Sequence, residues 1–114
     1  VFFDSRTEGN DHYFLSLQRL HAKYYPYGLT VIGVAMDPNP RALPTFAERN
    51  GVTFLIVADP FAAVVHKSYG TPREPEAYLL DREGRVDAVY TTRVDWQTTD
   101  FQKRVEKYIR LPGR

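Results

Sequence analysis

The sequence alternates short apolar segments with amphipathic stretches of helical period, and this alternation restricts the possible folds more than any other feature. The apolar segments are VFF at residues 1–3, LTVIGVAM at 29–36 and VTFLIVA at 52–58. Unbroken apolar strands are typical of parallel sheets that are buried on both faces. Parallel strands need crossover connections, and these are usually helices. The first half of the chain is therefore predicted to form two β-α-β units.

Two amphipathic stretches supply the crossover helices. The first enters its helix at Asn10 or Asp11, and its apolar residues recur at helical spacing until a proline and a glycine end it. Asn10 is predicted to be the N-cap, because its side chain can accept hydrogen bonds from the free amides of the first turn. The second helix covers residues 41–50, where Pro44 is tolerated only within the first turn.

The second half of the chain predicts a helix at residues 61–69, a β-hairpin at 77–91 and a final helix. The complete prediction is one α/β domain covering residues 1–114, with helices on both faces of a mixed five-stranded sheet. Its strand order is third, second, first, fourth, fifth, and the hairpin is antiparallel to the rest. We interpret the chain as a trimmed product whose N-terminal strand is shortened.

Composition excludes several functions. The formal charge is only +1 and no basic run is present, which argues against binding to nucleic acid. No apolar run is long enough to cross a bilayer, so no membrane insertion is predicted. The absence of cysteine excludes disulfides and thiolate metal sites within these residues. We predict no metal site and no cofactor.

Four segments of the chain resemble those of thioredoxin-fold redoxins of the TlpA/ResA type and, more distantly, of AhpC/TSA peroxiredoxins. They are VFFDSRTEGND, GLTVIGVAMD, VTFLIVADPFAAVVHKSYG and REPEAYLLDREGRV, and Val94-Asp95-Trp96 also matches a common later turn of the family. The resemblance implies a thioredoxin-like three-layer sandwich in which Pro75 is the cis-proline that faces the active-site turn. It also implies a role in redox homeostasis and an extracytoplasmic location in bacteria.

The active-site turn itself departs from the family. Glu8-Gly9-Asn10-Asp11 stands where the family carries C-x-x-C, so Glu8 and Asp11 occupy the positions of the two cysteines. The family's chemistry needs a thiolate nucleophile, and neither a carboxylate nor an amide can replace it. No catalytic residue is therefore assigned. We interpret the four-residue departure as a natural loss of the thiols.

The carboxylates near the turn allow two interpretations. Glu8, Asp11 and Glu74 could converge on a hard cation, which prefers several carboxylate oxygens. The alternative is a surface loop with a helix cap, neutralised by Arg6 and Arg73, and we favour it because Asn and Asp so often serve as caps.

Glu74 and Pro75 are the better candidates for a function. In related folds the backbone before the cis-proline resembles an exposed strand edge, which binds an extended peptide by β-augmentation and needs no cysteine. Pro75 could instead merely shape the start of a strand. The candidate binding residues are Arg6, Glu8, Asn10, Asp11, Arg73, Glu74 and Pro75.

The leading hypothesis is thus a thioredoxin-like protein without catalytic cysteines that binds a protein or peptide partner. One alternative is the family's thiol-disulfide oxidoreductase or antioxidant role, with cysteines supplied by other segments or by a partner. Another is a structural module of a larger exported protein.

The remaining polar and aromatic candidates favour structural roles. His12, His21 and His66 are scattered and show no metal-ligand spacing. His12 could pair with a neighbouring carboxylate as a general base, but no nucleophile stands beside it. Trp96 could form an interaction patch with Tyr90, although partial burial in the core is the more ordinary fate of a single tryptophan.

Overall fold

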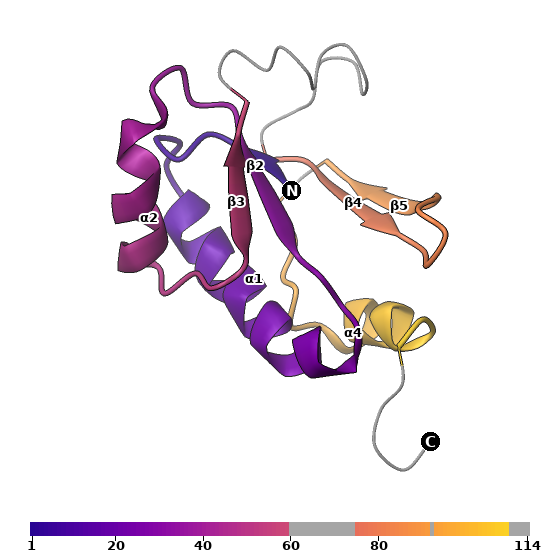
Figure 1. The fold of residues 1–114 in the computed structure, drawn as a ribbon. Helices are drawn as coiled ribbons and strands as arrows, with labels where there is room; N and C mark the ends of the chain where they lie inside the picture. The colour runs from indigo at the N-terminus through magenta and orange to yellow at the C-terminus, as the bar shows by residue number, and fades with distance from the viewer. Residues whose placement is uncertain (60–74, 92, 110–114) are drawn as a thin grey trace.

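The computed structural model describes residues 1–59, 75–91 and 93–109 (Figure 1). The predicted helix at 61–69 lies outside the described residues. The elements in chain order are β1 (Phe2–Phe3), α1 (Asn10–Tyr24), η1 (Tyr25–Tyr27), β2 (Ile32–Ala35), η2 (Pro40–Ala42), α2 (Leu43–Arg49), β3 (Leu55–Ala58), β4 (Ala77–Leu80), β5 (Val86–Tyr90) and α4 (Thr99–Glu106).

The three apolar segments form a parallel sheet, as predicted, in the order β1-β2-β3. Phe2 pairs with Val34, and Ile32 pairs with Leu55. Between the strands, Pro44 occupies the first turn of α2, the one position where the helix tolerates it. Among the described residues, no helix combines the length and the apolar character that a membrane span requires.

The predicted hairpin is also present. β4 and β5 pair antiparallel, with Ala77 opposite Tyr90. The Asp81 carboxylate accepts hydrogen bonds from the backbone amides of Glu83 and Arg85, both at 2.9 Å, and closes the turn. Gly84 completes the turn with a φ of 83°, a conformation that favours glycine.

The five strands do not form one continuous ladder. In the part of the chain that the structure describes, the hairpin joins the three-stranded sheet through a single antiparallel bridge between Phe2 and Glu76. Its two backbone hydrogen bonds measure 2.7 and 3.1 Å. The bridge places β4 beside β1, in agreement with the predicted strand order. Because β1 is only two residues long, the ladder stops there and the sheet divides into three plus two strands.

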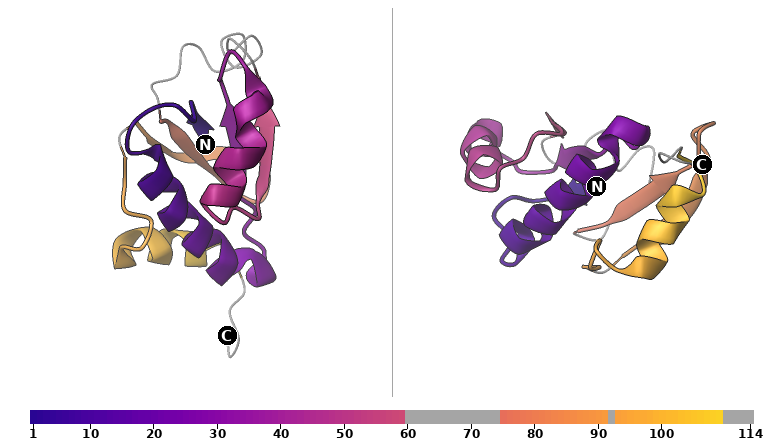
Figure 2. Two further views of the ribbon diagram at one scale, coloured as in Figure 1. Left: turned by 90° about the vertical axis from the view of Figure 1, so that its left-hand side faces the viewer. Right: turned by 90° about the horizontal axis from the view of Figure 1, so that it is seen from below.

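Helices α1 and α2 pack on the same side of the three-stranded sheet (Figure 2). Phe3 from β1 contacts Phe14 of α1 at 4.3 Å and Phe46 of α2 at 5.5 Å between ring centroids. Gly33 of β2 permits this approach, because a Cβ there would lie 3.2 Å from the Phe3 ring. The core of the domain therefore consists largely of aromatic rings held between these helices and the sheet.

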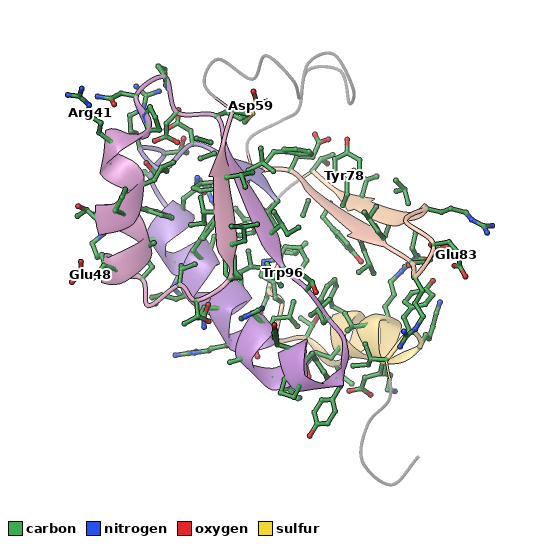
Figure 3. The ribbon with its side chains drawn as sticks, viewed as in Figure 1. Arg41, Glu48, Asp59, Tyr78, Glu83 and Trp96 are labelled. Carbon is green, nitrogen blue, oxygen red and sulfur yellow. The ribbon has the colours of Figure 1, made fainter. Side chains whose placement is uncertain are left out.

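Helix α4 packs against the hairpin and the end of α1. Trp96 is 2% exposed and contacts both Tyr90 and Phe101 edge-on, so the expected burial of this residue is confirmed. Figure 3 shows its side chain in the interior, between β2 and α4. The Tyr24 hydroxyl donates a 2.6 Å hydrogen bond to Glu106 and ties α1 to α4.

The prediction that the parallel strands are buried on both faces is confirmed for β1, whose two residues are both buried, but it is wrong for β2 and β3. Ile32, Leu55 and Val57 alternate with the inward residues and remain 43%, 59% and 40% exposed. An open, largely apolar cavity of about 530 Å³ lies between β2 and β4, where the two sheets diverge, and we call it the inter-sheet groove. Its lining includes Leu17, Leu20, Ile32, Leu80, Trp96 and Phe101.

Candidate functional site

The candidate site is the turn of residues 4–9, which connects the carboxyl end of β1 to α1. Ser5 anchors it, because its backbone amide donates a 2.9 Å hydrogen bond to the carboxylate of Asp37 and its hydroxyl donates to the other oxygen of the same carboxylate. Asp37 follows β2 and is buried. The turn is therefore fixed to the end of the adjacent strand β2 by a residue that precedes α1 in the sequence.

Arg6 is committed to Asp4. Its backbone amide donates to one carboxylate oxygen at 2.9 Å, and its guanidinium donates to both oxygens at 3.0 and 2.6 Å. The hydrogen bond from the Arg6 side chain lowers the pKa of Asp4 below its usual value. The positive charge of Arg6 is thus neutralised by Asp4 within the turn, and the Arg6 side chain lies exposed at its edge.

The prediction that Asn10 caps α1 is wrong. The N-cap is Gly9, whose φ of 91° directs the chain into the helix, and it makes no side-chain cap. Asn10 is the first helical residue and is 0% exposed. Its side-chain amide donates to the carbonyl of Asp4 at 2.8 Å, so it braces the turn from within. A left-handed glycine before the helix turns this side chain inward, away from the cap position.

Arg93 closes the turn from the far end of the sequence. Its guanidinium donates at 2.5 Å to the carbonyl of Glu8 and at 3.3–3.4 Å to the side-chain oxygen of Asn10. It also covers Gly9, where an added Cβ would lie 3.0 Å from the guanidinium carbon. Sequence reasoning missed this residue, since its only signal was its place directly before the matched Val94-Asp95-Trp96 turn.

Asp11 is held by the end of α2. Its carboxylate accepts hydrogen bonds from Asn50 at 2.7 Å and from the Arg49 guanidinium at 2.8 and 3.1 Å. The Asn50 hydrogen bond, followed by that of Arg49, lowers the pKa of Asp11. Neither partner was predicted from the sequence.

The described carboxylates of the turn are thus distributed among separate partners. Asp4 pairs with Arg6 and Asp11 with Arg49. Within residues 1–59, 75–91 and 93–109, no group of three or more His, Asp or Glu side chains could hold a metal ion. The candidates Arg73 and Glu74 lie outside the described residues.

The histidines also lie apart from one another. His12 is exposed on the first turn of α1, whereas His21 is buried against Tyr25 and Phe54 near the other end of the helix. Burial lowers the pKa of His21. His66 lies outside the described residues.

Pro75 lies at the same end of the sheet as the turn. It is buried and immediately precedes Glu76, whose backbone forms the bridge to Phe2. The Glu76 carboxylate accepts a 2.5 Å hydrogen bond from the Tyr78 hydroxyl. The backbone after Pro75 is therefore occupied by the protein's own strand, and the peptide-binding backbone predicted before Pro75 lies outside the described residues.

Solved structures with the same arrangement of elements define the class of fold. A thioredoxin-like protein in its oxidised form superposes with a TM-score of 0.73 at 19% identity, over 94% of this chain and 74% of that chain. A secreted disulfide oxidoreductase of Mycobacterium tuberculosis, homologous to DsbE of E. coli, gives a TM-score of 0.76 at 17% identity, over 93% and 77% of the two chains. The fold is thioredoxin-like, as predicted.

Sequence comparison identifies the family. The AhpC/TSA family profile matches residues 1–89, and the chain belongs to the AhpC/TSA family. The thiol-disulfide oxidoreductase ResA of Geobacillus thermodenitrificans is 31% identical over 75 residues, which is 66% of this chain. The matched stretch spans 42% of that protein's length.

Proposed function

We propose that this chain is a member of the AhpC/TSA family that binds an extended polypeptide at the turn of residues 4–9, at the first residues of α1 and at Pro75, and that it does not exchange disulfides. The observation that carries the proposal is the turn itself. Where the family resemblance places two cysteines, this chain has Glu8 and Asp11, and its turn is closed by hydrogen bonds from Arg93 and Asn10.

The absence of a thiol decides the chemistry. Disulfide exchange proceeds by attack of a thiolate on a disulfide sulfur, and peroxide reduction also begins with a thiolate. The groups at the start of α1 are an amide and carboxylates, which form no mixed disulfide. This chain by itself therefore has no nucleophile for the reaction.

The geometry favours binding. A turn that is already ordered loses little conformational entropy when a partner docks, which raises affinity for a given set of contacts. Arg6, Glu8 and Asp11 present exposed side chains on this ordered backbone, while the buried Asn10 shapes it. Arg73, Glu74 and Pro75 would complete the face, with backbone groups available for β-augmentation.

A titration followed by amide chemical shifts tests the proposal. The probe is reduced and alkylated insulin B chain, an extended polypeptide that has no reactive thiol. We expect saturable shifts at residues 6–11 and at Glu76, weakened by Glu8→Gln. The matched control is Glu83→Gln, an exposed glutamate in the hairpin turn (Figure 3). Shifts confined to other parts of the domain would refute binding at this face.

The family match supports one rival function. If another segment or a partner supplies cysteines, the domain could serve in thiol-disulfide exchange, the activity named for the ResA relative. The two functions separate in an insulin reduction assay with dithiothreitol. This polypeptide alone should not accelerate the reaction, and any catalysed reduction would contradict the proposal.

An extracytoplasmic location forms part of the proposal. Its support is the likeness to a secreted disulfide oxidoreductase. Fractionation of the native host with an antibody to this domain would test it, and a cytoplasmic signal alone would contradict it.

A further inference from the structure

We infer that Arg93 is the positioning residue of the binding face: it fixes the turn in the shape that a polypeptide partner recognises. This inference rests on the proposed function for its consequence, but its geometric basis is independent. Arg93 lies between β5 and α4, and its hydrogen bonds to Glu8 and Asn10 cross more than eighty positions of sequence.

The contacts of Arg93 are those of a planar fork. The Nη2 atom donates to the Glu8 carbonyl at 2.5 Å, and Nε and Nη2 both reach the Asn10 side-chain oxygen at 3.4 and 3.3 Å. A guanidinium can donate in several fixed directions at once, whereas a lysine ammonium is a compact point charge. Lysine at this position is therefore expected to restore only part of the network.

Gly9 and Arg93 form a matched pair. The nearest side-chain atoms to a Cβ built on Gly9 are the Cζ, Nε and Nη2 atoms of Arg93, at 3.0, 3.2 and 3.3 Å. The guanidinium therefore lies directly against the glycine backbone. Two features thus favour glycine here, its φ of 91° and the close approach of Arg93.

The position of these bonds connects them to binding. Arg93 holds the carbonyl of Glu8 and the side chain of Asn10, the residues on either side of Gly9. The orientation of residues 8–10 sets the direction in which the side chains of Glu8 and Asp11 project. Loss of the guanidinium should therefore disorder residues 8–10 while the side chains of Glu8 and Asp11 themselves remain.

The test compares Arg93→Met and Arg93→Lys with the control Arg104→Met. Arg104 of α4 makes a similar set of hydrogen bonds, to one side-chain oxygen and one backbone carbonyl of Asp87 in β5. These bonds do not involve the turn. Each variant is measured for its dissociation constant with alkylated insulin B chain, for the hydrogen-exchange rate of the Asn10 backbone amide and for its melting temperature.

We expect Arg93→Met to weaken binding about tenfold and to accelerate exchange of the Asn10 amide by a similar factor, as the loss of charge-assisted hydrogen bonds implies. Arg93→Lys should recover part of both effects. Arg104→Met should lower the melting temperature by about as much as Arg93→Met does, but it should leave the dissociation constant unchanged.

The outcomes separate the two proposals. Wild-type affinity in Arg93→Met, or equal loss of affinity in Arg104→Met, would overturn the role of Arg93. If the wild-type chain does not bind the probe, the proposed function fails. In that case unchanged exchange of the Asn10 amide in Arg93→Met would also overturn the positioning role, and accelerated exchange would support it.

Discussion

The two ends of β1 differ sharply in how their surroundings are stabilised. At its carboxyl end, a polar turn donates a hydrogen bond to Asp37 and accepts hydrogen bonds from Asn10 and Arg93. At its other end, the inter-sheet groove is apolar and open, and Ile32 and Leu80 on its rim are 43% and 45% exposed. One end is thus held by directional contacts, and the other offers apolar surface that the described residues leave uncovered.

This difference indicates which of the two regions depends more on the identity of its individual side chains. A buried polar group that loses its partner destabilises the fold by its full desolvation cost, so each turn residue depends on its neighbours. A half-exposed aliphatic side chain makes fewer contacts and can be replaced at little cost. The turn should therefore respond strongly to small substitutions, and the groove should not.

The largest contrast is expected between Asn10→Ala and Ile32→Ser. Asn10→Ala removes the donor to the Asp4 carbonyl inside a fully buried site and should lower the free energy of unfolding by about 1–3 kcal/mol. Ile32→Ser should change it by only about 0.5 kcal/mol. Urea unfolding followed by Trp96 fluorescence measures both. Equal losses in the two variants would remove the distinction between the two regions.

A second contrast uses two glycines with positive φ. Gly51→Ala introduces only the strain of a left-handed residue, since nothing lies within 4 Å of its Cβ, and should lower stability by about 1 kcal/mol. Gly9→Ala adds to the same strain a tight contact that forces the Arg93 guanidinium to shift, and it should lower stability further. In the Arg93→Met background this extra loss should shrink. A constant difference in both backgrounds would mean that the two residues are not coupled.

The pH dependence at the far end of α1 offers a smaller effect. Burial lowers the pKa of His21 from the usual 6.5, so the unfolded chain takes up the proton first as pH falls. The free energy of unfolding should therefore decrease as pH drops below about 6.5 and continue to fall until the folded state is protonated. His21→Gln should lose this dependence. Unfolding curves recorded across this range would contradict the account if both proteins behaved identically.

The smallest effect is expected from Asp11→Asn. The pair with Arg49 is exposed, so its contribution should stay below about 1 kcal/mol. Because hydrogen bonds from Asn50 and Arg49 lower the pKa of Asp11, this contribution is present above the ordinary value of 3.8 and disappears as pH falls through the lowered pKa. The difference between wild type and variant should vanish in acid, and a difference that persists there would implicate packing.

The sequence predicted the elements that depend on local patterns. Unbroken apolar segments indicated β1, β2 and β3, and two short segments on either side of the charged turn at 81–84 indicated the hairpin. The resemblance located the turn and its missing thiols. Two features of the fold escaped local reasoning, the division of the sheet after the Phe2–Glu76 bridge and the exposure of one sheet face, since both depend on what covers or extends each strand.

The candidate site was less predictable because its contacts are long-range. Arg93 lies more than eighty residues from the turn, and the partners of Asp11 lie 38 and 39 residues away. Helical or strand period carries no information about such pairs. Asn10 was expected at the cap because local statistics favour it there, whereas the left-handed Gly9 moved the helix start and turned the amide inward.

The most direct test of the account is hydrogen exchange of the whole domain with and without alkylated insulin B chain. We expect the amides of Ser5 and Asn10, which donate to Asp37 and to Thr7, to be protected in the free protein. Added peptide should increase protection at residues 6–11. Exchange of the free turn at the rate of an unstructured peptide would contradict the account. New protection confined to the groove residues 29–32 and 78–80 would contradict it equally, because the apolar end of β1 would then be the binding surface.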